Sequence, residues 1–97
     1  MSALFQLPVK YEELTSKTRW RVRAQYVRDQ HGLCCHCKGD LTKDPIGKDA
    51  ALAVNHSLFP PGFFTHPVHL HHNHKTGWTI GAIHPHCNAV LFQYYGE

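Results

Sequence analysis

Apolar residues recur with helical spacing in the segment that follows Thr15. Residues 16–31 contain no glycine or proline, Thr15 or Ser16 can cap the start, and Gly32 stands where helices commonly end. We therefore expect a helix over residues 16–31. Its apolar stripe, predicted to face the core, has spacings of four, seven and eleven residues and consists of Trp20, Ala24, Val27 and His31.

Two short apolar runs and one longer run follow in the last third of the chain. Residues 68–72 and 78–83 have the composition of strands, and the intervening Asn-His-Lys-Thr-Gly has that of a turn. After Pro85, a residue that the first turn of a helix tolerates, no helix breaker occurs until Gly96. The pattern predicts a β-hairpin and then a C-terminal helix.

The remaining segments lack a sustained period. Residues 1–15 contain a proline and are expected to form an arm with a short turn near residues 11–14. Residues 33–39 fit a tight turn, and residues 40–50 fit a loop or a short hairpin. Proline and glycine interrupt residues 51–67, so we expect a loop whose aromatic side chains pack over the core in preference to stacking on bases: Phe59, Phe63 and Phe64.

Length and composition limit the fold to one small domain. The chain has 97 residues, of which 42% are hydrophobic, which is enough for a modest core. We expect an N-terminal arm at residues 1–15 and one α+β domain at residues 16–97. The longest apolar stretch, residues 50–54, is far too short for a bilayer span, which predicts a soluble, cytoplasmic chain without a membrane partner.

Positive charge is concentrated in the predicted first helix. The formal net charge of the chain is +3, whereas residues 16–31 carry five basic residues and one acidic residue, a net +4. Basic side chains neutralise backbone phosphates irrespective of base sequence, so this helix favours an anionic partner. An ordinary solvated helix face is the alternative. The candidate nucleic-acid-binding residues are Lys17, Arg19, Arg21, Arg23, Arg28 and, in the hairpin turn, Lys75.

The cysteines and one histidine form two pairs with the spacing of metal ligands. Cys34 and Cys37 make a CxxC pair, and His84 and Cys87 make an HxxC pair at the start of the last predicted helix. Together they form a tetrahedral Cys3His set, which is typical of a closed, structural zinc site. Metal would then join the knuckle at residues 34–37 to the final helix. Free thiols without metal are the alternative, and three nearby residues compete as ligands: Cys35, His36 and His86.

Histidines are concentrated just upstream of the second predicted strand. His71, His72 and His74 offer metal ligands and a neutral imidazole near pH 7, and Asn88 projects from the following helix. Phosphodiester hydrolysis requires such groups, because a base must take a proton from water and a cation must stabilise negative charge. In an ideal strand, neighbouring residues point to opposite faces, so two adjacent histidines can serve one phosphate only where the strand twists. Solvent-exposed turn histidines are the alternative.

These motifs resemble a known enzyme family. CxxC, then HLHHNHKTG, then HPHCN resembles the HNH (ββα-metal, His-Me finger) endonucleases, in the zinc-stapled branch related to phage recombination endonuclease VII; the likeness covers about residues 23–97. The resemblance implies that His72 is the general base, that His71 and Asn88 bind a catalytic divalent metal, and that His74 aids phosphate binding or site geometry. His71 stands where many relatives have aspartate, so the catalytic metal is Mg²⁺, Mn²⁺ or another transition ion.

The function expected from the resemblance is that of a metal-dependent DNA endonuclease. Its expected partner is double-stranded or branched DNA, in the host cytoplasm if the chain is phage-encoded. A homodimer and a phage protein partner stay open. Two alternatives belong to other classes: a zinc-stapled nucleic-acid-binding module without catalysis, and a structural zinc protein within a larger machine.

Overall fold

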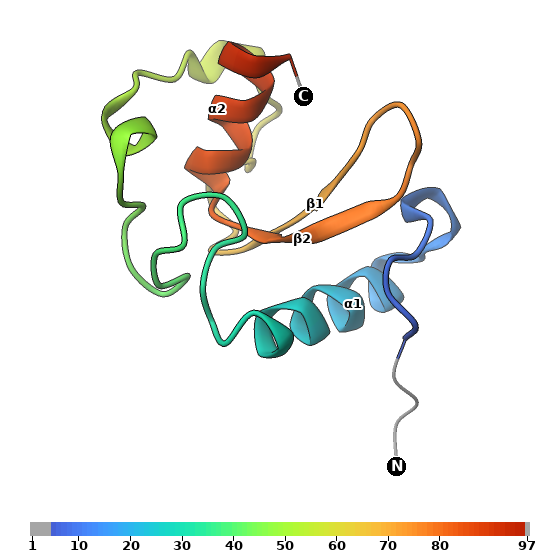
Figure 1. Ribbon diagram of the computed structural model, residues 1–97. Coiled ribbons are helices and arrows are strands. Elements are labelled where there is room, and N and C mark those ends of the chain that lie inside the picture. Colours follow the sequence, from blue (N-terminus) through green and yellow to red (C-terminus); the bar gives the residue numbers. More distant parts are fainter. Residues whose placement is uncertain (1–4, 97) are drawn as a thin grey trace.

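A computed structural model describes residues 5–96, so residues 1–4 of the expected arm and Glu97 lie outside the described residues. The hairpin of β1 (His69–His72) and β2 (Thr79–Ile83) is the centre of the fold. Helix α1 (Ser16–Asp29) covers one side of this hairpin, and α2 (Pro85–Tyr95) rises from the end of β2 on the other side (Figure 1). The small α+β fold predicted from the sequence is confirmed.

Helix α1 begins where the sequence predicts. The Thr15 hydroxyl accepts a hydrogen bond from the Thr18 amide, and the Thr18 hydroxyl accepts one from the Thr15 amide, which is a reciprocal capping box. The helix ends at Asp29, two residues before the predicted end. Helix α2 also starts at the predicted proline and ends at Tyr95, and the following Gly96 has a left-handed φ of 73°, as is common after a helix.

The buried face of α1 differs from the predicted one. Val22 and Tyr26 are buried, whereas Trp20 is 60% exposed and Ala24 and His31 are also exposed. Of the predicted stripe, Val27 alone is half-buried and packs against the core, so the prediction is wrong for Trp20, Ala24 and His31. The buried face, formed by Val22 and Tyr26, is the one that meets β2: the Tyr26 hydroxyl and the Thr79 hydroxyl share a buried hydrogen bond of 2.9 Å.

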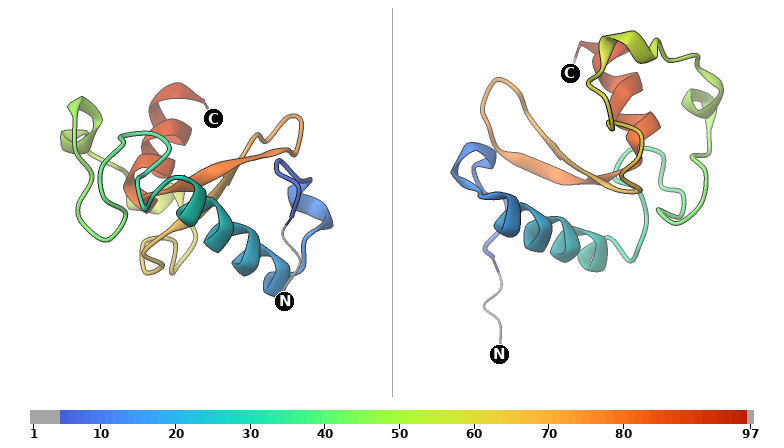
Figure 2. Two further views of the ribbon diagram at one scale, coloured as in Figure 1. Left: turned by 60° about the horizontal axis from the view of Figure 1, so that its bottom comes forward. Right: turned by 180° about the vertical axis from the view of Figure 1, so that it is seen from behind.

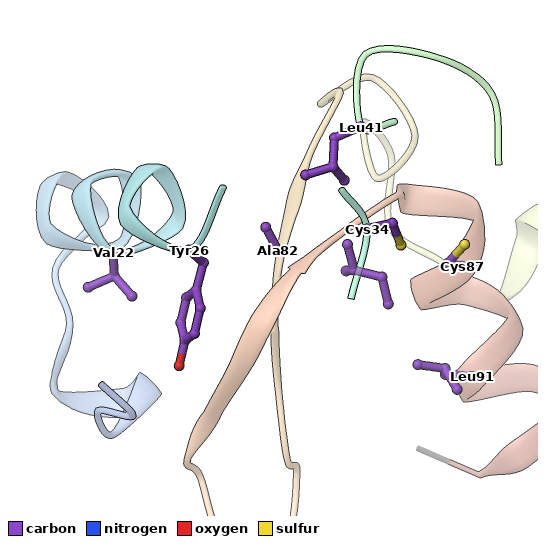
Figure 3. Close-up of a cluster of buried hydrophobic side chains, with 8 residues drawn as sticks. Val22, Tyr26, Cys34, Leu41, Ala82, Cys87 and Leu91 are labelled. Atoms are coloured by element: carbon purple, nitrogen blue, oxygen red, sulfur yellow. The ribbon is translucent and has the colours of Figure 1, made fainter. Parts of the chain in front are cut away.

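The core lies on both sides of β2. Val22 and Tyr26 project from α1 toward Ala82 in β2, while Cys34, Cys87 and Leu91 lie beyond the strand (Figure 3). Cys34 and Cys87, two of the predicted zinc ligands, are each only 1% exposed. The candidate metal ligands are therefore part of the core.

The outer edge of β2 is covered by residues from two other segments. The Thr79 amide donates to the carbonyl of Val9 at 2.9 Å, and the side chain of Gln30 pairs with both the amide and the carbonyl of Ala82. Lys10 forms a bridge with Trp78, so the N-terminal segment lies beside the tip of the hairpin in both views of Figure 2. Residues 5–15 thus pack against the domain, with the 3₁₀-helix η1 (Tyr11–Glu13) at the predicted turn.

The register of the hairpin changes between His71 and His72. His71 pairs with Gly81, but His72 pairs with Thr79, which leaves Ile80 as an extra residue in β2. Such a bulge increases the local twist and redirects side chains. The bulge lies between His71 and His72, where two adjacent histidines can face one site only if the strand twists.

The segment between the knuckle and the hairpin is mostly irregular. It includes 3₁₀-helices η2 (Lys48–Ala51) and η3 (His56–Leu58). Its aromatic side chains are half-buried and form a satellite cluster with one residue of α2: Phe59, Phe63, Phe64 and Phe92. Within residues 5–96, none of the helices has the length and apolar character needed to span a bilayer.

Candidate functional site

The four predicted zinc ligands come together at one point. The thiol sulfurs of Cys34, Cys37 and Cys87 and a ring nitrogen of His84 all lie within 4.8 Å of one another. His84 Nδ1 is 3.4 Å from Cys37 Sγ and 3.8 Å from Cys87 Sγ. Tetrahedral zinc with metal–ligand distances near 2.0 and 2.3 Å places its N and S ligands about 3.5 Å apart. The cluster therefore suits a metal ion, and its donors are compatible with structural zinc.

The ring of His84 is oriented for coordination through one nitrogen. Its Nε2 lies 2.9 Å from the carbonyl oxygens of both Asp40 and Lys43, so this nitrogen bears the proton and donates. The lone pair is then on Nδ1, which faces the two sulfurs. Backbone acceptors of this kind commonly fix the tautomer of a metal-bound histidine.

Hydrogen bonds also reach the sulfur atoms of the cluster and change their pKa values. A hydrogen bond with the Cys87 thiol, together with backbone amides such as that of His36, lowers the pKa of Cys34 despite its burial. The same hydrogen bond and burial raise the pKa of Cys87. Gly39 donates its amide to Cys37 Sγ at 3.3 Å. Thiolates are the form that binds zinc, so an ion here would release the shared proton.

The three competing ligands have other roles. His36 Nε2 is 2.8 Å from a carboxylate oxygen of Asp49, and His86 Nε2 is 3.1 Å from the Asp49 carbonyl. Cys35 donates its amide to Ala82, and burial raises the pKa of its thiol to about 11. Among the described residues, the metal-ligand cluster therefore consists of the two predicted pairs.

A separate cleft of about 710 Å³ contains the predicted catalytic residues. His71 and His72 at the end of β1, His74 in the turn and Asn88 on α2 all line it. Asn88 follows Cys87, and consecutive helix residues point about 100° apart, so Cys87 faces the knuckle while Asn88 faces β1. All four residues of β1 (His69–His72) line this cleft, and the buried His71 also lines a second cavity, together with Asp49 and Tyr95.

The side-chain amide of Asn88 is oriented by His69. His69 Nε2 donates to the Phe63 carbonyl at 2.7 Å, which leaves Nδ1 to accept from Asn88 Nδ2 at 3.1 Å. Burial is the main cause that lowers the pKa of His69, which favours this neutral form. The carboxamide oxygen of Asn88 is then the atom available for a cation.

His72 is held between aromatic rings. Its ring lies parallel to that of Tyr11, with centroids 3.8 Å apart and planes at 8°, and the ring of His74 meets it at 88°. Burial, with smaller contributions from His74 and His71, lowers the pKa of His72, and the nearby Glu12 carboxylate partly opposes this shift. The imidazole is therefore neutral near pH 7 and can accept a proton.

The charge of the cleft suits an anion. Arg19 and Arg23, one helical turn apart on α1, line the wall opposite the hairpin. None of the described residues that line the cleft is acidic, whereas five are histidines: His66, His69, His71, His72 and His74.

The other predicted nucleic-acid-binding residues lie outside the lining of this cleft. Arg21 and Arg28 are exposed on α1, and Arg28 lies 3.8 Å from the neighbouring Asp29 carboxylate. Lys17 is exposed in the first turn of the same helix, and Lys75 is exposed in the hairpin turn. The structure thus brings two of the predicted cations to the histidines.

Several residues that line this cleft are not predicted from the sequence as part of the site, and three of them have notable side chains. The sequence places Tyr11 in an arm and Trp20 in the core, and it leaves open whether His69 supports the site or has no role, yet all three line the cleft. Trp20 could have been found by testing both faces of the helix. Nothing local in the sequence indicates that Tyr11 reaches His72, because 60 residues separate them.

Comparison with models of protein families, with curated proteins and with solved structures finds no match for this chain.

Proposed function

We propose that this protein is a metal-dependent DNA endonuclease of the HNH type that hydrolyses phosphodiester bonds. The observation that supports it best is that one cleft, whose described lining contains no acidic residue, is lined by His71, His72, Asn88, Arg19 and Arg23. A neutral imidazole, an amide and two guanidinium groups in one place match the requirements of phosphate ester hydrolysis.

In the proposed reaction, the arginines bind the phosphate and His72 acts as general base. His72 takes a proton from water as the water oxygen bonds to phosphorus and the bond from phosphorus to the 3′ oxygen breaks. A divalent cation, when bound, supplies stabilisation of the negative charge on the phosphate and the departing oxygen. His74 stays beside His72 and holds its ring.

His71 and the Asn88 carboxamide oxygen are the proposed ligands of that cation. The hydrogen bond from Asn88 Nδ2 to His69 supports the oxygen as the donor atom. Mg²⁺ prefers oxygen ligands, whereas a set that includes imidazole suits transition ions better. We therefore expect Mn²⁺, Co²⁺ or Ni²⁺ to activate the enzyme at least as well as Mg²⁺.

Zinc is the proposed ion at the Cys3His cluster, and its role is structural. With four protein ligands, no position is left for water, as in closed zinc sites. The ion would join Cys37 in the knuckle to His84 at the start of α2, across 46 intervening residues. It would thereby hold the helix that bears Asn88.

Nicking of supercoiled plasmid by the zinc-loaded protein tests the proposal. Each of Mg²⁺, Mn²⁺, Co²⁺ and Ni²⁺ is added separately, and the variant His72→Ala is compared with His31→Ala, which removes an exposed histidine at the end of α1. We expect His72→Ala to lower the nicking rate by about 10²–10⁴-fold. Zinc content and DNA affinity should stay unchanged, and His31→Ala should cleave like wild type. Full turnover by His72→Ala would refute the assignment.

A nucleic-acid-binding module without catalysis is the second candidate. The acid-free lining of the cleft favours it, because carboxylate ligands for Mg²⁺ are absent from the described lining. Salt-dependent DNA binding without nicking in any of the four metals would support this candidate and exclude the nuclease.

A further inference from the structure

The ring of Tyr11, from the N-terminal segment, supports the ring of His72. The two rings lie 3.8 Å apart and nearly parallel, and both side chains line the cleft. A parallel stack restricts the plane of an imidazole but leaves both ring nitrogens at the edge, outside the contact. The ring of His74, at 4.7 Å and 88°, restricts His72 further.

Tyr11 is itself held by contacts with two other elements. Its amide donates to the Gly77 carbonyl at 2.8 Å, which fixes its backbone to the hairpin turn. Arg19 Nη1 donates to the Tyr11 hydroxyl at 3.2 Å, and the Arg19 guanidinium carbon lies 5.5 Å from the centre of the ring. The ring therefore has a defined position between α1 and β1.

We propose that Tyr11 is a positioning residue that orients His72, so that the N-terminal segment is part of the active site. This inference rests on the proposed function. A general base works only within hydrogen-bond reach of the proton that it takes, and small misplacements reduce the rate strongly. Arg19 connects this arrangement to the proposed phosphate-binding site, because it donates a hydrogen bond to Tyr11 and also lines the cleft.

Three variants separate the ring of Tyr11 from its hydroxyl and from general loosening of the segment. Tyr11→Leu removes the ring, Tyr11→Phe keeps the ring but removes the acceptor for Arg19, and Trp78→Leu is the matched control. Trp78 is an aromatic residue at the same junction, where it packs under Lys10 and is outside the lining of the cleft. Kinetics of plasmid nicking are measured for each, with zinc content as a check of folding.

We expect Tyr11→Leu to lower kcat by about ten- to a hundredfold with KM unchanged. Tyr11→Phe should retain most of kcat, and Trp78→Leu should retain all of it. A second readout does not depend on activity: in the NMR spectrum of the zinc-loaded protein, without other metal, the ring protons of His72 should be shifted upfield by the Tyr11 ring current. Tyr11→Leu should remove this shift, and Tyr11→Phe and Trp78→Leu should keep it.

The outcomes distinguish this inference from the proposed function. Wild-type kcat in Tyr11→Leu, or ring protons of His72 without the upfield shift in the wild-type protein, would overturn the positioning role while the nuclease stands. A wild-type protein that nicks DNA in none of the four metals would overturn the nuclease, and with it the catalytic role of Tyr11, even if the ring-current shift were present.

Discussion

A single hydrogen bond decides which atom Asn88 offers to the cleft. His69 can accept from the amide nitrogen of Asn88 because its own proton is used by the Phe63 carbonyl. Without His69, rotation of the carboxamide by 180° would place nitrogen, which has no lone pair for a cation, where oxygen stood. The loop that contains Phe63 thus influences the orientation of Asn88, a proposed metal ligand, through His69.

We predict that His69→Leu weakens binding of Mn²⁺ to the zinc-loaded protein by about ten- to a hundredfold, the usual effect of losing a residue that orients a ligand. Titration followed by electron paramagnetic resonance measures this affinity directly. His66→Leu, which changes an exposed histidine of the same cleft, should bind Mn²⁺ like wild type. Equal affinity in the His69 variant and in wild type would contradict the orienting role.

At this scale, the sequence predicts residues whose chemistry is local. Cys34 and Cys37, like His84 and Cys87, are each three residues apart, so their spacing alone indicates that each pair can chelate. Tyr11 could not be predicted in this way. Its contact with His72 depends on the path of the N-terminal segment along the hairpin, and no spacing rule describes that path.

Helix α1 has two faces with different tasks. Val22 and Tyr26 pack on β2, while Trp20, Arg19 and Arg23 line the cleft. The sequence predicts the length of this helix well, because caps and breakers are local signals. It does not predict which residues are buried, because the position of the hairpin decides which face of the helix meets β2.

We predict that Val22→Ala lowers the free energy of unfolding by about 2 kcal/mol, since it leaves a cavity in a fully buried site. Trp20→Ala should change it by less than about 0.5 kcal/mol, although it removes a much larger side chain, because most of the indole is already exposed. Urea unfolding followed by circular dichroism, with zinc bound, gives both values. A larger loss for Trp20→Ala than for Val22→Ala would show that the predicted stripe faces the core after all.

In the molecule as a whole, the candidate metal cluster and the hydrophobic core share residues. Cys34 and Cys87 belong both to the ligand set and to the buried cluster that joins α1, β2 and α2. The hydrophobic core of a domain of this size contributes only modest stability, and a bound metal can add to the free energy of folding. The order of the elements and the two ligand pairs follow from sequence patterns, but this sharing of residues follows only from the packing.

We predict that Cys34→Ser loses bound zinc and most of its cooperative thermal unfolding transition. Cys35→Ser is the matched control: its thiol is adjacent in sequence but outside the cluster, and the variant should keep one zinc per chain and a melting temperature near that of wild type. Zinc released by acid is measured with a colorimetric chelator, and unfolding by calorimetry. Retention of zinc by Cys34→Ser, or its loss from Cys35→Ser, would contradict the assigned ligand set.

Cys87 and Asn88 are consecutive residues in the first turn of α2, yet they face different sites. If both sites bind ions, a rigid turn of helix makes the two occupancies thermodynamically linked: whichever ion binds first reduces the orientational freedom that the second must remove. Such linkage is reciprocal. Zinc would then tighten the affinity for the second cation by the same factor by which that cation protects zinc from a chelator.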